Sequence, residues 1–221
     1  MSGVEPAHPG QTVSGVEPAH PGQTVSGAEP AHPGQTVSTT SGRERELMLT
    51  GIGGQGVQLA AQVIAQGATA DGKEVLVFGS YGGMMRGGST DSTVVIGDQP
   101  IEAPPVLSST WSAILMHHQY WMPLRDRIRD RGLVLVNTSV FEDELDADRY
   151  QVVEVPATDV AADRGNPLLA AMVMAGVYAR RSGLVSLPGL LEGMRRSLPP
   201  YRRQLIEANE GALGAGWELA A

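Results

Sequence analysis

The chain has 221 residues, 16 Lys and Arg against 24 Asp and Glu, a formal net charge of −8 and no cysteine. Without cysteine, a disulfide framework, a Cys-ligated zinc site and an iron–sulfur cluster held by this chain alone are excluded. The acidic balance argues against a nucleic-acid partner, because phosphate binding needs a basic face. The longest apolar runs fall far short of the ~18 residues of a membrane helix, and the N-terminus does not resemble a signal peptide, so we expect a cytoplasmic protein without membrane contact.

The N-terminal part is repetitive. Residues 2–37 are three near-identical copies of a twelve-residue unit, SGVEPAHPGQTV twice and SGAEPAHPGQTV once. Each copy contains two prolines, which remove backbone donors and restrict the residue before them, so the unit cannot sustain a helix. Its apolar content is too low to offset about 1–2 kcal/mol of ordering entropy per residue. We therefore expect a disordered, dispensable Pro/Gly-rich tail at 1–42 and one domain at 43–221.

Strands and helices alternate along the domain. The apolar patterns predict strands at 46–50, 73–78, 92–96, 112–116, 133–136 and 150–155. A helix is expected from the glycines after the first strand to about residue 70, a charged helix at about 120–130, and helices from 167 to the end with breaks near Gly183 and 198–200. The turn at Gly97-Asp98 predicts a hairpin between 92–96 and 99–102. We thus expect a three-layer, Rossmann-like α/β fold with a mixed sheet flanked by helices.

The segment GIGGQG at 51–56 fits the pattern G-x-G-x-x-G between a strand and a helix. Gly51 and Gly53 allow a tight turn and close backbone approach. The N–H groups of Gln55, Gly56 and Val57 are then expected to be free and to point at an anion at the helix N-terminus.

Two alternatives bear on that loop. An NAD-dependent enzyme would place an acid at the end of the second strand, whereas this strand ends VFGS at 77–80, so NAD is disfavoured. Alternatively, Gly54 and Gly56 serve only to let helix and sheet pack closely.

A second glycine-rich segment, GSYGGMMRGGST at 79–90, carries Arg86 in front of Gly87 and Gly88. A glycine-rich backbone can approach a ligand closely, and the guanidinium of Arg86 is suited to bind a carboxylate or a phosphate. Arg86 as an ordinary surface residue is an equal alternative. Tyr81 is a candidate for stacking or hydrogen bonding, or a residue at the edge of the core.

The remaining candidates carry little chemistry. His117 and His118 follow a strand, where neighbouring side chains point to opposite faces, so they are not expected to share a metal ion, and we predict no metal site. The sequence shows no recognisable nucleophile, Walker lysine or redox group. This inventory suits one part of a larger enzyme.

Three separated stretches of the chain resemble the gamma subunit, or gamma domain, of 2-oxoacid:ferredoxin oxidoreductases. They are TGIGGQGVQLAAQVIA, SYGGMMRGGSTDSTVVIGDQPIEAPPV and PATDVAADRGNPLLAAMVMAGVYARRSGLVSLPGLLEGM, in the order of the family. The likeness covers residues 44–219 and leaves the tail out.

The resemblance implies a subunit that is inactive alone. Its complex would convert a 2-oxoacid such as pyruvate, 2-oxoglutarate or 2-ketoisovalerate to acyl-CoA and CO2 and reduce ferredoxin. Thiamine diphosphate and [4Fe–4S] clusters would belong to alpha, beta and delta-type partner subunits.

The resemblance also assigns roles to residues. The loop with Gly51, Gly53, Gly54, Gln55 and Gly56 becomes a candidate for the phosphates of coenzyme A. Arg86 and Tyr81, with the neighbouring Gly87 and Gly88, become candidates for the mouth of the active-site cleft, Arg86 being the candidate catalytic residue.

The sequence departs from the family at three positions. Gly83 and Met84 stand where the family has Pro and Glu, and Ala171 stands where it has Asn. These changes bear on substrate class and coenzyme A contacts more than on fold. Two other functions stay open from the residues alone: a stand-alone nucleotide- or coenzyme A-binding regulatory module, and a purely structural assembly subunit.

Overall fold

The computed structural model describes residues 44–80, 88–102 and 107–221, all within the unit Thr39–Ala221. Six strands form one sheet in the order β2-β3-β1-β4-β5-β6. The strands are β1 (Glu44–Ile52), β2 (Glu74–Ser80), β3 (Ser89–Gly97), β4 (Thr110–Leu115), β5 (Ile128–Asn137) and β6 (Gln151–Val155). The helices are α1 (Val57–Ala70), α2 (Met122–Arg125), α3 (Ala157–Asp163), α4 (Ala170–Ser182), α5 (Leu187–Ser197) and α6 (Ile206–Leu219), with short 3₁₀ turns η1 (His118–Tyr120), η2 (Pro167–Leu169) and η3 (Pro200–Leu205).

The sheet is mixed, as the sequence predicts, but for a different reason. Strands β1, β4, β5 and β6 are parallel, whereas β3 lies antiparallel between β1 and β2. The predicted hairpin between 92–96 and 99–102 is wrong, because residues 98–102 form no strand and β3 pairs with β1 and β2. Two long apolar neighbours compete better for β3 than a short polar segment does.

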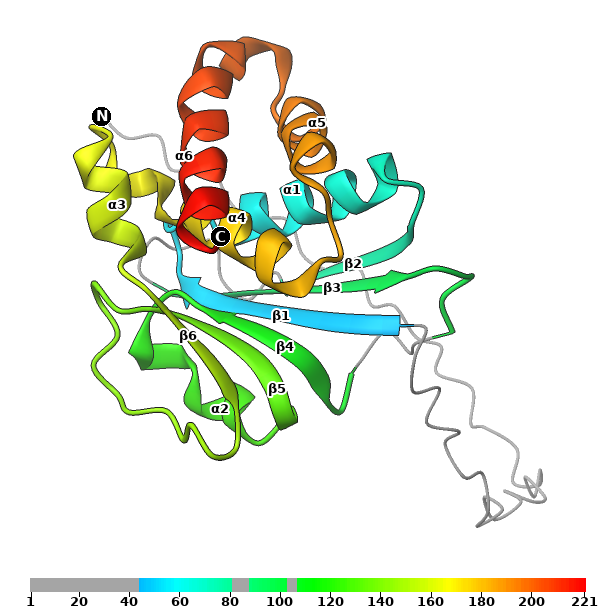
Figure 1. Cartoon of the computed structure of the whole chain (residues 1–221), viewed down its shortest axis with the longest axis vertical. Coiled ribbons are helices and arrows are strands. Elements are labelled where there is room, and N and C mark those ends of the chain that lie inside the picture. The colour runs from blue at the N-terminus through cyan, green and yellow to red at the C-terminus, as the bar shows by residue number, and fades with distance from the viewer. Residues whose placement is uncertain (1–43, 81–87, 103–106) are drawn as a thin grey trace, which may run out of the picture. The chain divides into compact units, whose positions relative to one another are not determined.

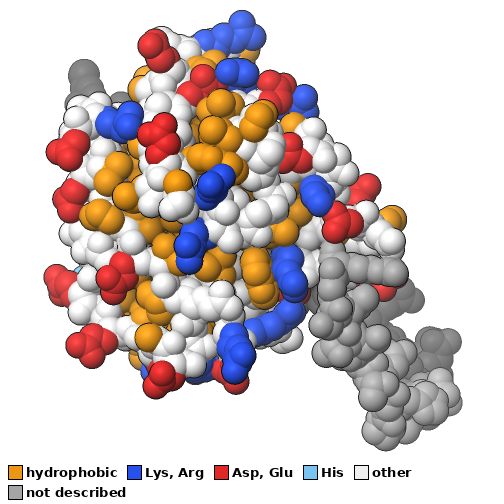
Figure 2. Space-filling model, in the orientation of Figure 1, with side chains coloured by type: hydrophobic (Ala, Val, Ile, Leu, Met, Phe, Trp, Pro, Cys, Tyr) orange, Lys and Arg blue, Asp and Glu red, His pale blue; other side chains and the backbone are white. Residues whose placement is uncertain are grey.

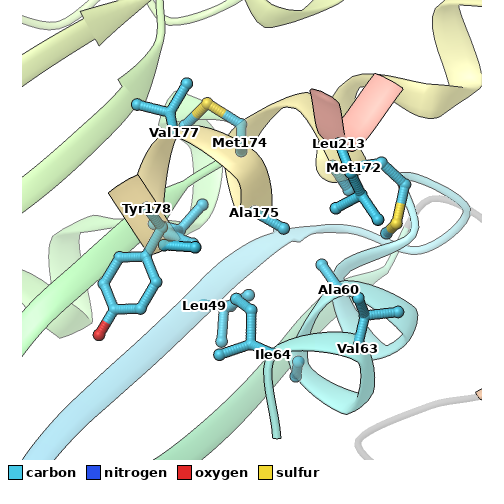
Figure 3. Close-up of a cluster of buried hydrophobic side chains, with 14 of the residues drawn as sticks. Leu49, Ala60, Val63, Ile64, Met172, Met174, Ala175, Val177, Tyr178 and Leu213 are labelled. Carbon is cyan, nitrogen blue, oxygen red and sulfur yellow. The ribbon is translucent and has the colours of Figure 1, made fainter. Parts of the chain in front are cut away.

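One face of the sheet is covered by α1, α4, α5 and α6 (Figure 1). Helix α1 forms as predicted, because its apolar residues recur every three or four positions and give it one buried stripe. Ala60 and Ile64 of α1 lie close to Leu49 of β1, with α4 packed beside them (Figure 3). The core residues in this layer are almost entirely buried and form one cluster that spans all four helices.

The other face has a thinner cover. Met48, Leu115 and Val134 of the sheet pack there against Trp121 and Leu124. Trp121 lies between η1 and α2, and Leu124 lies in α2. The charged helix predicted at 120–130 is wrong: α2 ends at Arg125, and Ile128 already pairs with Thr110 at the start of β5. The α/β class is confirmed. On this face the cover consists of η1, the four-residue helix α2 and the non-helical segment that follows β5.

Acidic and basic side chains are interspersed over the face drawn in Figure 2, with apolar patches between them. Several charges pair across elements: Arg129 lies 2.7 Å from Glu46, and Arg195 lies 2.8 Å from Glu210. Among the described helices, none is both long and apolar enough to span a bilayer.

Candidate functional site

The carboxyl ends of β1 and β4 mark the point where the chain changes direction across the sheet. From β1 the chain crosses through α1 to β2 on one side, and from β4 it proceeds to β5 and β6 on the other. In open α/β sheets, ligands bind in the crevice outside the strand ends at such a switch point. The glycine loop follows β1 here, and Met116 with the two histidines follows β4.

The glycine loop is a turn that only glycine accommodates easily. β1 ends at Ile52 and α1 begins at Val57, with Gly54 at φ +107° and Gly56 at φ +81°. Positive φ is costly for residues with a Cβ, so these two positions favour glycine. Among the residues that the structure describes, a Cβ placed at Gly54 would meet nothing within 4 Å. The turn therefore leaves room for a ligand at its tip.

The amides of the loop differ in their availability. Gln55 N–H donates to the carbonyl oxygen of Ile52 at 3.0 Å, so the prediction that this N–H is free is wrong. The amides of Gly56 and Val57, in contrast, have no acceptor among the described residues, and no side chain caps α1. Two adjacent amides at a helix N-terminus favour an anion electrostatically.

Gly53 of the first glycine-rich segment and Gly88 of the second, 35 residues apart in the chain, meet at this edge. Gly53 N–H donates to the carbonyl oxygen of Gly88 at 2.8 Å, and Ile52 pairs with Ser89 at the end of the β1–β3 ladder. Tyr81, Arg86 and Gly87 lie outside the described residues, and their roles stay predictions. The sequence did not predict this contact, because the contact depends on the position of β3 next to β1 in the sheet.

Helix α4 packs against the glycine loop. Gly56 faces Ala171, whose Cβ would lie 3.4 Å from a Cβ at position 56. Ala171 is buried. From the sequence, this residue is expected to depart from the family pattern, and it lies directly against Gly56 of the candidate anion site. Asn166 shapes the approach to α4, because its side chain accepts a hydrogen bond from Leu168 N–H at 3.1 Å.

The side chains of His117 and His118 lie next to each other, so the expectation that they point to opposite faces is wrong. Their ring centroids lie 4.4 Å apart, because His117 is extended while His118 already begins the turn η1. His118 Nδ1 donates to the carbonyl of Val140 at 3.1 Å, and His117 Nδ1 accepts from Gln119 N–H at 3.2 Å. Burial, followed by the neighbouring His118, lowers the pKa of His117. Each Nδ1 atom is therefore engaged within the protein.

A cavity of about 420 Å³ lies beside the same end of β1. Its walls include Phe78, Asp91 and Thr93 from β2 and β3, together with Tyr120 and Arg127. Asp91 accepts a hydrogen bond from the Ser89 hydroxyl at 3.3 Å. Within the described part of the chain, no group of three His, Asp or Glu side chains is placed to hold a metal ion.

Comparison with known proteins gives one consistent result. The family model described as pyruvate ferredoxin/flavodoxin oxidoreductase matches residues 46–219. The chain is 32% identical to the 2-oxoglutarate synthase subunit KorC of Methanocaldococcus jannaschii, over 80% of this chain and 94% of that protein. It is 34% identical to KorC of Methanothermobacter thermautotrophicus, over 79% of this chain and 94% of that protein.

A solved structure agrees with these sequence matches. The gamma subunit of a keto/oxoacid ferredoxin oxidoreductase from Geobacter sulfurreducens superposes with a TM-score of 0.67 at 25% identity. The alignment covers 80% of this chain and 98% of that one. The share left uncovered in this chain is close in size to its repetitive N-terminal segment.

Proposed function

Because the chain belongs to the pyruvate ferredoxin/flavodoxin oxidoreductase family, we propose that it works as the gamma-type subunit of a 2-oxoacid:ferredoxin oxidoreductase. The observation that carries this proposal is the extent of the match, which covers the whole domain and nearly the whole length of separate relatives named as subunits. With no cysteine, the chain has no thiolate to bind an iron–sulfur cluster. The redox chemistry then requires other subunits.

The reaction proposed for the complex joins a 2-oxoacid to coenzyme A. The oxoacid loses CO2, the acyl group forms a thioester with the sulfur of coenzyme A, and two electrons reduce ferredoxin. Thiamine diphosphate and [4Fe–4S] clusters supply the carbanion and electron-transfer chemistry, and we assign them to alpha, beta and delta-type partners. The two KorC relatives make 2-oxoglutarate the first oxoacid to test.

For this chain we propose a role in binding coenzyme A. The amides of Gly56 and Val57 and the positive end of the α1 dipole suit a phosphate group. No described residue fills the space next to Gly54, which supports that approach. The hydrogen bond from Gly53 holds Gly88 at the same edge of the sheet, and we propose that Arg86, two residues earlier in the chain, acts there. Nothing in the comparisons supports the alternative of a stand-alone binding module.

The proposal is tested by assay of the complex purified with this chain. Ferredoxin reduction should require both coenzyme A and one oxoacid from a panel of 2-oxoglutarate, pyruvate and 2-ketoisovalerate. Removal of this chain should abolish the coenzyme A-dependent step. Full activity without it would refute the subunit role.

Arg86→Ala tests the proposed cleft. It should raise the KM for coenzyme A or for the oxoacid about tenfold and lower turnover, because a charge-assisted hydrogen bond contributes about 1.5–3 kcal/mol. Arg181→Ala, at an exposed position near the end of α4, is the matched control and should leave both unchanged. Unchanged kinetics for Arg86→Ala would remove Arg86 from the site.

A further inference from the structure

The hydrogen-bond ladder between β1 and β4 ends in an unusual way. Met116 N–H donates to the carbonyl of Thr50 at 2.9 Å, which continues the parallel pairing of the two strands. In a regular parallel ladder the next bond would run from Ile52 N–H to the carbonyl of Met116. Ile52 N–H instead donates to Gln55 Oε1 at 2.7 Å, and Gln55 Nε2 donates to the carbonyl of Met116 at 3.4 Å. The Gln55 side chain thus lies between the two groups that would otherwise pair.

A carboxamide suits this position chemically. Its oxygen accepts a hydrogen bond and its NH2 group donates one, so it relays the bond that the two strands no longer make directly. A direct backbone bond holds neighbouring strands about 4.8 Å apart. An inserted amide needs more room, so β1 and β4 must separate where the ladder ends. That separation lies at the switch point described above.

The backbone around Gln55 is fitted to this insertion. Gln55 N–H also bonds the Ile52 carbonyl, so both polar backbone groups of Ile52 are held by one residue. Gly51 leaves the space for the side chain, since a Cβ there would lie 2.7 Å from Gln55 Oε1 and 2.9 Å from Met116 Cβ. The first glycine of the motif is therefore required by the packing of the Gln55 side chain.

We infer that Gln55 is a positioning residue: its carboxamide is inserted between β1 and β4, holds their ends apart and fixes the loop that presents the Gly56 and Val57 amides. It acts through Ile52 and Met116, and the ligand contacts the loop amides. The part of this inference that concerns the ligand rests on the proposed binding of coenzyme A. The insertion itself rests only on the contacts within this chain.

The test compares Gln55→Met with Gln62→Met. Methionine has a similar length and lacks both the amide donor and acceptor, and Gln62 is an exposed residue of α1, the helix that follows the loop. In the full chain, Gln55→Met should speed hydrogen exchange of the Ile52 amide about tenfold or more, because this N–H loses its acceptor. In the assembled complex it should raise the KM for coenzyme A about tenfold and leave kcat within about twofold, as expected when ground-state and transition-state binding weaken equally. Gln62→Met should change neither.

A second variant, Gln55→Glu, guards against a folding failure. It keeps the size and the acceptor for Ile52, but the ionised carboxylate has no donor for the Met116 carbonyl. This variant should also raise the KM for coenzyme A, and backbone amide hydrogens around Met116 should exchange faster. Unchanged exchange in both variants would overturn the insertion. Faster exchange with unchanged KM, or a fall in kcat alone, would overturn the positioning role.

The proposed function fails in a distinguishable way. If the unsubstituted complex shows no dependence on coenzyme A, the proposed function fails and the ligand part of this inference fails with it. The exchange rate at Ile52 still decides whether Gln55 completes the ladder.

Discussion

The two faces of the sheet are built on different principles. On the helical face, backbones touch: a Cβ at Gly216 would lie 2.0 Å from the Val173 carbonyl oxygen, and one at Gly176 would lie 2.1 Å from that of Leu213. On the opposite face, a four-residue helix and a loop leave a cavity of about 420 Å³. The first arrangement brings the backbones of α4 and α6 into direct contact. The second leaves room next to the strand ends where the candidate site lies.

Gly216→Ala is expected to have the largest effect on stability. The added methyl group would overlap the backbone of α4, so α4 and α6 must separate. Overpacking of this kind should lower the free energy of unfolding by about 3 kcal/mol. Urea denaturation monitored by circular dichroism measures the change.

Gly214→Ala is the matched control, because it lies on the same helix and its Cβ would meet nothing within 4 Å. It should raise stability by about 0.5–1 kcal/mol through better helix propensity. Equal effects of the two variants would contradict the close contact between α4 and α6.

Truncation of one methionine on each face sharpens the comparison. Met172 is 2% exposed in the helical core, whereas Met48 is 7% exposed and lines the cavity. Met172→Ala should cost about 3–4 kcal/mol, and Met48→Ala about 1–2 kcal/mol, since the lost contacts beside an existing cavity are fewer. Thermal or urea unfolding gives both values. A larger cost for Met48→Ala would show that the second face is the more tightly packed.

The smallest expected effect concerns pH. Burial and His118 lower the pKa of His117, while Glu142 partly opposes them, so the folded protein favours the neutral ring. The unfolded chain takes up this proton near its ordinary pKa of about 6.5. Stability should therefore fall as pH decreases from 7.5 to 5.

His117→Asn should reduce that pH dependence. Asparagine can still accept the hydrogen bond from Gln119 N–H, as Asn166 does for Leu168, but it does not titrate. Unfolding curves at several pH values provide the measurement. An unchanged slope would show that His117 contributes nothing to the pH dependence.

Most elements were predictable because their patterns are local. The buried strand at 46–50, helix α1 and the breaks near Gly183 and 198–200 follow from apolar periodicity and from glycine and proline. The failures are non-local. The order of β3 between β1 and β2 depends on tertiary pairing, and the Arg–Asp alternation at 125–131 resembles a solvated helix although Ile128 anchors a strand.

The candidate site shows the same division. The motif GIGGQG correctly located a turn between strand and helix. The expectation that Gly51 and Gly53 are the glycines that allow this turn is wrong, because the positive φ angles lie at Gly54 and Gly56 and Gly51 still pairs within β1. It did not indicate that Gln55 would pair with Ile52, because a side chain's partner across the sheet is not encoded in spacing. The contact of Ala171 with Gly56 was likewise invisible in a linear pattern.

The central claim is that this chain is one subunit of a larger oxidoreductase. The most direct measurement is affinity purification from the native host under anaerobic conditions, with the co-purifying chains identified by mass spectrometry. We expect recovery of a thiamine diphosphate-binding subunit and a cysteine-rich, ferredoxin-like chain in fixed proportion to this protein. Recovery of this protein alone, at full yield, would contradict the account.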